Sequence, residues 1–379
     1  MEKTKVKTLV RQIRGVSYKP EDLHNELDDN SVVLLRANNI DEGKINFDDV
    51  VYVDKSKVSD EQYLKYGDIL ICASSGSKNL VGKAASIRFN TECTFGAFCK
   101  VIRPKEGLDE YLSVYFQSPI YRRKISEVAI GVNINNIRNE HIDELDIPVF
   151  LNDEQASIVK KIHLIQEVIS NRKAELEKLD DLIKARFVEM FGNGHDGFCN
   201  TKRLGEFCKF QQGTQVPVEE QIEEQLEGYT RFLRIIDYTQ APQIPRYVSV
   251  KGRKIAEDSV VIVRYGATAG FVGHGYAGIL ANNLFEVVPD ESILSKDFLY
   301  LALKYGTFEQ EVHDKAFGAA MPALSFGMMN DIGVVTPNVT AQNSFVDFVH
   351  QVDKSKVAVQ KTLEQTQTLF DSLMQKYFG

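Results

Sequence analysis

Two long stretches of the chain alternate hydrophobic and polar positions with a period near 3.5 residues. The first follows Pro148 and the second follows Pro337, and each continues for about 40 residues. The steps between apolar positions alternate between four and three, which predicts a coiled-coil helix about 60 Å long in each stretch. The apolar positions are Ile158, Ile162, Ile165, Ile169, Leu176, Leu179, Ile183 and Met190 in the first stretch, and Phe345, Val349, Val352, Val359, Leu363, Phe370, Leu373 and Tyr377 in the second.

Polar residues interrupt the two hydrophobic seams at different places. The first seam has Arg172 where the second has Val359, and the second has Lys356 where the first has Ile169. Unlike seams favour pairing of the two helices with each other in one chain over two identical homodimeric contacts. The alternative, in which each helix packs on its own globular region, stays open at this point.

The residues before each helix carry a different pattern. Runs rich in β-branched and aromatic residues are broken by Gly, Asn and Asp, as in "SVVLLRANNI" (31–40), "DVVYV" (49–53) and "GDILICA" (67–73). Such runs predict short strands joined by turns. Each helix is therefore expected to follow a mixed α/β region of about 145 residues.

The strand-rich region and its helix occur twice. "LIKARFVEMFG" (182–192) aligns with "LFDSLMQKYFG" (369–379) at an offset of 187. "LLRANNI" (34–40) aligns with "FLRIIDY" (232–238), and "GDILICASSG" (67–76) aligns with "EDSVVIVRYG" (257–266). These alignments pair Arg36 with Arg234, Gly76 with Gly266 and Gly15 with Gly213. The repeat predicts an α+β chain with two copies of one unit of about 190 residues.

The repeat also sets the expected domain boundaries. Mixed α/β domains are expected at residues 1–147 and 193–336, and long helical segments at 148–192 and 337–379. The Gly- and Asn-rich segment at 192–200 marks the join between the copies.

Composition narrows the class of protein. The chain has 379 residues, of which 43% are hydrophobic and 26% are charged, the balance of a globular protein with two or three domains. No apolar run reaches the length of a membrane span, and "MEKTKVK" does not resemble a signal peptide, so a cytoplasmic location is expected. The five cysteines form no C-x-x-C pair and the seven histidines no H-x-x-x-H pair, so neither disulfides nor a bound metal is expected.

The net charge of −8 by itself does not suggest a nucleic-acid binder. The charges are grouped in blocks, however: residues 1–20 hold six Lys or Arg against one Glu, whereas residues 21–63 hold four against twelve Asp or Glu. Because a phosphate backbone responds to the local field, positive faces can exist on this acidic chain.

The segment "RYGATAGFVGHGYAG" (264–278) contains two cofactor fingerprints, G-x-G-x-x-G and F-x-G-x-G. The first needs a helix after the glycines to bind a pyrophosphate, but "ILANNLFEVV" reads as a strand. The second needs a partner such as N-P-P-Y, and no two prolines are adjacent. "GSKNLVGKA" (76–84) has five residues between its glycines and no hydroxyl after the lysine, so it is not a phosphate loop. Pro289-Asp290 is not followed by the acidic-x-Lys triplet of a metal nuclease. No catalytic motif remains.

The glycine loops of the two copies occupy equivalent places, and the side chains around them suit DNA. Arg, Lys, Asn and Ser read base edges and bind phosphates, and glycine lets the backbone approach a ligand. The alternatives are hairpin turns with solvated polar residues, and structural ion pairs for Arg36 and Arg234. The candidate DNA-binding residues are Arg36, Asn38, Asn39, Ser74, Ser75, Lys78, Asn79, Lys83, Arg234, Asp237, Arg264, Tyr265, Thr268, Asn282 and Asn283.

The chain resembles the specificity subunit (S, or HsdS) of type I restriction-modification enzymes over nearly its whole length. The resemblance lies in the order and duplication of "IRGVSYKPEDL" (13–23), "LLRANNI", "GDILI", "RYGATAG" and "KLDDLIKARFVEMFG" (178–192). It implies two target-recognition domains separated by two long helices that pair antiparallel with pseudo-two-fold symmetry. Each domain would read one half of a split, asymmetric DNA site, and the helices would act as a ruler for the spacer.

The same resemblance implies a chain without catalysis or a cofactor of its own. It would be a scaffold for two modification subunits, which bind S-adenosylmethionine and methylate adenine, and for restriction subunits that use ATP and Mg²⁺. The main alternative is a stand-alone DNA methyltransferase or nuclease with degenerate motifs. A third alternative is a protein-interaction scaffold with no DNA role.

Overall fold

The computed structural model of the chain describes residues 2–77, 79–128, 135–192, 199–240, 243–316 and 323–379. Their contacts form two compact units. Unit 1 consists of Met1–Lys173 and Lys361–Gly379, and unit 2 consists of Ala174–Gln360. The two long helices are therefore each divided between the units, and each unit is built from one strand-rich region and two helix halves.

Unit 1 contains two four-stranded sheets, in the orders β10-β8-β12-β2 and β11-β4-β7-β3. The first is antiparallel, and the second contains the parallel pair β11–β4. Leu70 and Val101 of the first sheet and Val33 and Phe95 of the second share one core. The strands are β2 (Val10–Arg14), β3 (Leu23–His24), β4 (Ser31–Leu35), β7 (Val51–Asp54), β8 (Ile69–Cys72), β10 (Ala84–Ser86), β11 (Cys93–Phe95) and β12 (Cys99–Pro104).

Unit 2 repeats this plan. Its sheet β16-β23-β20-β21 follows the same order as β2-β12-β8-β10, and β17 pairs parallel with β22 as β4 does with β11. A Cβ on Gly15 would lie 2.1 Å from the carbonyl oxygen of Gly96, and one on Gly213 would lie 2.1 Å from that of Ala281, so the same close approach occurs in both copies. The predicted repeat is thus confirmed. The strands are β16 (Cys208–Gln212), β17 (Thr230–Leu233), β18 (Arg246–Val248), β19 (Lys254–Ile255), β20 (Val260–Val263), β21 (Val272–Gly273), β22 (Gly278–Leu280) and β23 (Leu284–Pro289).

Short elements complete each unit. The two-stranded ladders are β1 (Lys3–Lys5) with β14 (Asp146–Pro148), β5 (Ile40–Asp41) with β6 (Lys44–Ile45), β9 (Ser74–Ser75) with β13 (Asn135–Asn136) and β15 (Thr201–Arg203) with β24 (Gly333–Val335). The short helices are α1 (Asp109–Phe116), α2 (Pro119–Val128), α3 (Asn139–Asp143), α5 (Leu204–Phe207), α6 (Ile235–Thr239), α7 (Lys296–Tyr305), α8 (Phe308–Ala316) and α9 (Phe326–Asn330). The 3₁₀ turns are η1 (Val6–Thr8), η2 (Pro20–Asp22), η3 (Ala37–Asn39), η4 (Lys55–Lys57), η5 (Asp60–Gln62) and η6 (Val218–Glu220).

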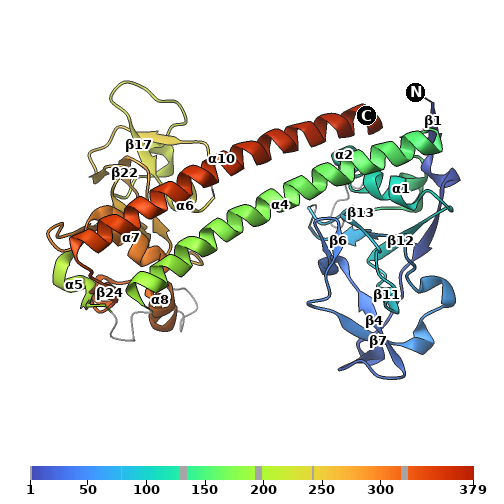
Figure 1. Cartoon of the computed structure of the whole chain (residues 1–379), viewed down its shortest axis with the longest axis horizontal. Helices are drawn as coiled ribbons and strands as arrows, with labels where there is room; N and C mark the ends of the chain where they lie inside the picture. The colour runs from blue at the N-terminus through green and yellow to red at the C-terminus, as the bar shows by residue number, and fades with distance from the viewer. Residues whose placement is uncertain (1, 78, 129–134, 193–198, 241–242, 317–322) are drawn as a thin grey trace. The chain divides into compact units, whose positions relative to one another are not determined.

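The two long helices are α4 (Asn152–Phe191) and α10 (Val339–Phe378), each of 40 residues and drawn in green and red in Figure 1. In unit 1 the start of α4 packs against the end of α10, with Ile158 and Phe370 in one buried cluster. In unit 2 the end of α4 packs against the start of α10, with Ile183 and Phe345 in another. The two helices therefore pair antiparallel, and the predicted α+β fold class with two long helices is confirmed.

Each long helix packs on a globular region at both ends as well as on the other helix, and its C-terminal end contacts the region of the other copy. Phe378 lies 5.6 Å from the ring of Tyr115 on α1, and Phe191 lies 5.1 Å from the ring of Phe298 on α7. Phe187, Phe191, Met374 and Phe378 are buried although the seam positions did not include them. The heptad pattern did not identify these four residues, because a helix end that contacts a second surface needs a wider apolar face than a helix that contacts only another helix. The helices thus pair with each other and each helix start packs on the region that precedes it, whereas each helix end packs on the region of the other copy.

Within the described residues, no helix combines the length and the apolar character that crossing a lipid bilayer requires. All five cysteines have free thiols, and every one except Cys199 is buried.

Candidate functional site

Four of the candidate residues meet in one hollow of unit 1. Arg36 and Asn38 lie in the turn after β4, and Ser74 and Ser75 follow the end of β8. All four line a cavity of about 790 Å³. Its other lining residues, which are mostly apolar, are Val16, Ser17, Tyr18, Ala37, Gly76, Leu80, Gly96, Ala97, Phe98 and Cys99.

Arg36 and Asn38 share one acidic partner at the rim of this hollow. Arg36 Nη2 donates to Asp49 Oδ2 at 2.9 Å, and Asn38 Nδ2 donates to the same oxygen at 2.7 Å. The Asp49 side chain is 73% exposed, so this ion pair is screened by water and is worth little stability. Arg36 Nε is buried without a hydrogen-bond partner. The ion-pair alternative for Arg36 is therefore real, but the pair is weak enough for Arg36 to exchange Asp49 for an outside acceptor.

Asn39 and Asp237 are buried in equivalent turns of the two units. Asn39 Oδ1 accepts from the backbone N–H of Arg36 at 2.8 Å, and Asp237 Oδ2 accepts from that of Arg234 at 2.8 Å. Asp237 also accepts two bonds from the Arg234 guanidinium, at 3.0 and 3.1 Å. Asn39, Arg234 and Asp237 thus hold the turns, and the burial of Asn39 and Asp237 leaves those two side chains no outward face in the free chain. Direct DNA contact by these three residues stays a prediction.

The glycine loop of unit 1 is braced by α2. Arg122 Nη1 donates to the carbonyl of Val81 at 2.5 Å, and Arg122 Nη2 donates to that of Asn79 at 3.1 Å. The Asn79 side chain is exposed, whereas Lys83 is half-buried and lines a second hollow of about 410 Å³. Lys78 lies outside the described residues. The loop therefore separates Lys83 from the hollow that Arg36 lines.

Glu42 contributes an anionic side to this second hollow. Lys173 on α4 donates to both Glu42 carboxylate oxygens, at 2.9 and 3.0 Å. This hydrogen-bonded ion pair holds the pKa of Glu42 below its ordinary value, and the charges of Lys44 and Lys83 act in the same direction. Since Lys83 lines the same hollow as the Glu42 carboxylate, its net field toward an outside phosphate is weaker than that of a lone lysine.

In unit 2 the corresponding strand end carries a cation stacked on aromatic rings. The guanidinium of Arg264 lies 4.8 Å from the ring centre of Tyr265 and 5.7 Å from that of Phe326. Arg264 Nε donates to the carbonyl of Leu324 at 3.3 Å, and Tyr265 and Thr268 are exposed. Stacking orients the flat guanidinium and leaves its remaining N–H groups for an outside acceptor.

Asn282 and Asn283 follow β22, next to Arg264. The backbone N–H of Arg264 donates to the carbonyl of Asn283 at 2.9 Å, and Asn283 Oδ1 is buried without a partner. The Asn282 carbonyl accepts from Gln212 Nε2 at 3.2 Å. Arg264, Tyr265, Asn282 and Asn283 are therefore brought together at one strand end of unit 2.

The same backbone frame holds different side chains in the two units. The N–H of Ser74 donates to the carbonyl of Phe98 at 3.0 Å, and the N–H of Arg264 donates to that of Asn283 at 2.9 Å. Ser74 and Phe98 in unit 1 thus take the places of Arg264 and Asn283 in unit 2. Phe98 was missed from the sequence, although a phenylalanine in the turn "GAF" (96–98), between two strand-like runs, is a usable signal.

The glycines of the segment 264–278 serve packing and turns. Gly273 lies in β21, and a Cβ there would lie 2.5 Å from Tyr238 Cδ1. A Cβ on Gly278 would lie 2.4 Å from the carbonyl oxygen of Arg231, and Gly278 begins a strand, not a helix. The residues after these glycines form the strands β22 and β23, as the sequence context predicted.

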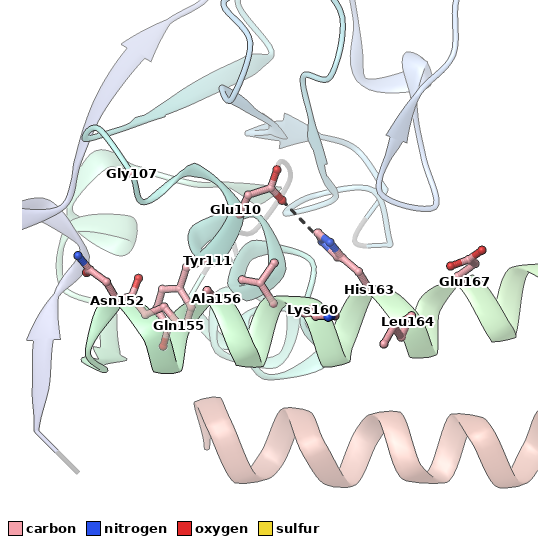
Figure 2. Close-up of a pocket in the computed structure, with 11 residues that line it drawn as sticks. Gly107, Glu110, Tyr111, Asn152, Gln155, Ala156, Lys160, His163, Leu164 and Glu167 are labelled. Atoms are coloured by element: carbon pink, nitrogen blue, oxygen red, sulfur yellow. Dashed lines mark ion pairs between the residues drawn. The ribbon is translucent and has the colours of Figure 1, made fainter.

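A separate hollow of about 540 Å³ lies between α1 and α4 in unit 1, shown in Figure 2. Glu110 on α1 points toward His163 on α4, with 3.7 Å between Glu110 Oε2 and His163 Nε2, and Arg88 lies 3.0 Å from the same oxygen. In the part of the chain that the structure describes, no group of three or more His, Cys, Asp or Glu side chains could hold a metal ion. The hollow thus offers a paired carboxylate and no recognisable catalytic set.

Comparisons with known proteins give one consistent result. The family model described as "Type I restriction modification DNA specificity domain" matches the chain twice, at residues 18–179 and 199–366. The specificity subunit of the type I restriction enzyme StySPI from Salmonella potsdam is 40% identical over 180 residues, which are 47% of this chain and 39% of that protein. The EcoKI specificity subunit from Escherichia coli K12 is 38% identical over 193 residues, which are 51% of this chain and 42% of that protein. The aligned region spans only about two fifths of the length of these two relatives.

Two solved structures share the fold along the whole chain. The S subunit of a type I restriction-modification system from M. genitalium covers 100% of this chain and 96% of its own, with 18% identity and a TM-score of 0.55. A chain from a structure on complex assembly and conformational transition of the type I R-M system covers 100% of this chain and 97% of its own, with 18% identity and a TM-score of 0.59. At this identity the likeness concerns the fold.

Proposed function

This chain belongs to the type I restriction modification DNA specificity domain family, and from that premise we propose that it is the sequence-reading subunit of a type I restriction-modification complex. Unit 1 reads one half of a split, asymmetric DNA site and unit 2 reads the other. The chain itself performs no catalysis.

One observation carries this proposal. The backbone has the same hydrogen-bond pattern at equivalent strand ends of the two units, but the side chains at those positions differ. Ser74 and Ser75 follow β8, and Arg264 and Tyr265 follow β20, each pair just before an equivalent glycine, Gly76 or Gly266. A duplicated frame with different polar and aromatic side chains suits the reading of two different base sequences, since base edges are distinguished by hydrogen-bond pattern and by apolar contact.

The two long helices would set the distance between the half-sites. Both α4 and α10 contribute residues to unit 1 and to unit 2. At 1.5 Å per residue, a helix of 40 residues is about 60 Å long, compared with about 34 Å for one turn of DNA. Half-sites one to two turns apart are therefore within the reach of this design.

The partners we propose are duplex DNA, modification subunits and restriction subunits. Because the chain contains two copies of one unit, we propose two modification subunits. The exposed apolar side chains of Leu164 and Leu182 on α4 and of Val357 and Leu369 on α10 offer contact area for helices of such partners. S-adenosylmethionine, ATP and Mg²⁺ would be bound by those subunits. Target adenines would be flipped into the pocket of the modification subunit.

Mapping of methylated adenines tests this function. A genome that carries the chain and its modification partner should show methylation at one split, asymmetric sequence, and deletion of the chain should remove it. The purified chain alone should transfer no labelled methyl group from S-adenosylmethionine to DNA and should not cleave DNA. Methyl transfer without a partner would instead favour the stand-alone methyltransferase.

A further inference from the structure

An exposed phenylalanine stands at the rim of the unit 1 hollow. Phe98 is 72% exposed and lies in the turn between β11 and β12, beside Ser74 and Ser75. Its main chain is fixed, because the carbonyl of Phe98 accepts from the N–H groups of Ala73 and Ser74 at 2.9 and 3.0 Å. The ring is therefore held out from a rigid strand end toward the solvent.

The fold does not require an aromatic ring at this position. In unit 2 the equivalent carbonyl belongs to Asn283, and the same frame forms around a polar amide. An exposed ring also gains nothing from burial in the core, which is where apolar side chains stabilise a protein. The Phe98 ring is thus available for contact with something outside the folded chain.

The neighbours of Phe98 indicate what that partner is. Ser74, Ser75 and Asn38 place hydroxyl and amide groups around the ring, and Arg36 supplies a cation beside them. An apolar surface next to short polar groups and one cation matches the major-groove edge of an A·T pair, where the 5-methyl group of thymine adjoins hydrogen-bonding atoms and the phosphates lie beyond. The Arg264 and Asn283 side chains in unit 2 present no such apolar surface.

We propose that Phe98 is a specificity-determining residue of unit 1 and contacts the 5-methyl group of a thymine in its half-site. This inference rests on the proposed function and adds to it the chemistry of one base contact. It also assigns base recognition by an apolar side chain to unit 1, and base recognition by a cationic side chain, Arg264, to unit 2.

Replacement of thymine by deoxyuridine tests the contact, because it removes the methyl group and keeps the base pair. The full chain, assembled with its modification subunit, is assayed for methyl transfer to duplexes of the mapped site in which each thymine is replaced singly. At low enzyme concentration, deoxyuridine at one position of one half-site should lower the rate of methyl transfer about fourfold, because one buried methyl group is lost. Deoxyuridine at the other positions should change the rate little. Phe98→Ala should lower the rate on the thymine duplex by a similar factor and should be indifferent to deoxyuridine at the sensitive position.

Two further variants separate apolar contact from a general effect. Phe98→Leu keeps an apolar side chain and should retain the dependence on the methyl group. Tyr66→Ala removes another exposed aromatic side chain of unit 1, which precedes β8 whereas Ser74 follows it, and should leave both the rate and the thymine dependence unchanged.

The outcomes distinguish this inference from the proposed function. Equal sensitivity to deoxyuridine in the wild-type and Phe98→Ala complexes would overturn the contact, and so would a mapped site with no A·T pair in the half-site that Arg36→Ala relaxes. Loss of activity in Phe98→Ala without any effect of deoxyuridine would point to ring stacking on a base and would also overturn it. A wild-type complex that methylates no specific sequence would instead refute the proposed function, and the contact with it.

Discussion

At the scale of the residue, Gly82 is fitted closely against α2. Its φ is +81°, and a Cβ there would lie 2.5 Å from Ile125 Cγ2 and 2.8 Å from Arg122 Nη1. We expect Gly82→Ala to destabilise unit 1 by about 2 kcal/mol, because it combines a strained backbone with overpacking. Hydrogen exchange of the β8 and β10 amides measures this loss. Gly76→Ala is the matched control in the same loop, since nothing lies within 4 Å of its added Cβ, and it should change exchange little.

The buried thiol of Cys93 predicts a pH dependence of stability. Burial raises the pKa of this thiol to about 12, from a value near 9 in the unfolded chain. Above pH 9 the unfolded state loses the proton and the folded state keeps it, so stability falls as the pH rises. Relative to Cys93→Ala, the wild-type chain should lose about 1 kcal/mol between pH 9 and pH 10. Urea unfolding followed by circular dichroism at both pH values checks this, and a constant difference between the two proteins would refute it.

The residue types in the sequence predicted which side chains lie together at the strand ends. They predicted less well which of these side chains face the solvent. Arg36, Asn38, Ser74 and Ser75 do line one hollow, because each follows a strand of the same unit. Asp237 has the same polar character, but the turn that follows β17 uses it as an internal acceptor for Arg234. A polar residue after a strand can cap a turn or face a partner, and only the packed turn distinguishes these roles.

At the scale of the element, the end of α4 and the start of α10 are joined by packed, buried aromatic rings. The Phe187 ring on α4 lies 5.2 Å from that of Phe191 and 5.4 Å from that of Phe345 on α10. Phe187→Ala should therefore destabilise unit 2 by about 3 to 5 kcal/mol through a buried cavity. Leu182→Ala on the same helix, where the side chain is 48% exposed, should cost less than about 1 kcal/mol. Urea midpoints of the two variants make the comparison.

The length of the helices should determine the spacer in the DNA site. Four residues inserted after Glu175 in α4 and four after the equivalent Thr362 in α10 lengthen each helix by about 6 Å. We expect the mapped half-sites to move apart by about two base pairs. Four residues inserted in α4 alone should disturb the pairing with α10 and change or abolish recognition. Unchanged spacing after the double insertion would count against the ruler role.

The hydrophobic seam predicted both helices and their pairing because a heptad pattern depends only on local spacing. It did not identify Phe187, Phe191, Met374 or Phe378, since their burial comes from globular regions distant in the sequence. The seam therefore described the contact between the helices, and the structure added the contact of each helix end with its own unit.

At the scale of the whole molecule, substitutions in the two units should affect the two half-sites independently. Arg36→Ala should relax base preference in one half-site and Arg264→Ala in the other, each weakening binding by about 1 to 3 kcal/mol where the side chain bonds a base. Arg11→Ala is the control, because Arg11 also pairs with an exposed carboxylate of unit 1 but does not line the hollow. Methylation mapping with each variant reads out the half-sites. If Arg36→Ala and Arg264→Ala relaxed the base preference in the same half-site, the proposal that each unit reads a different half-site would be refuted.

The sequence by itself determined the duplication, the two helices and the absence of recognisable cofactor motifs from the glycine loops, because repeats, periodicity and turn residues are written along the chain. Only the tertiary structure decided that Arg36 and Ser74 share a hollow with Phe98, that Asp237 is buried and that Lys83 lines another hollow with Glu42. The physical reason is that strands pair over long distances in the sequence, so the neighbours of a side chain at a strand end are set by sheet order and turn packing.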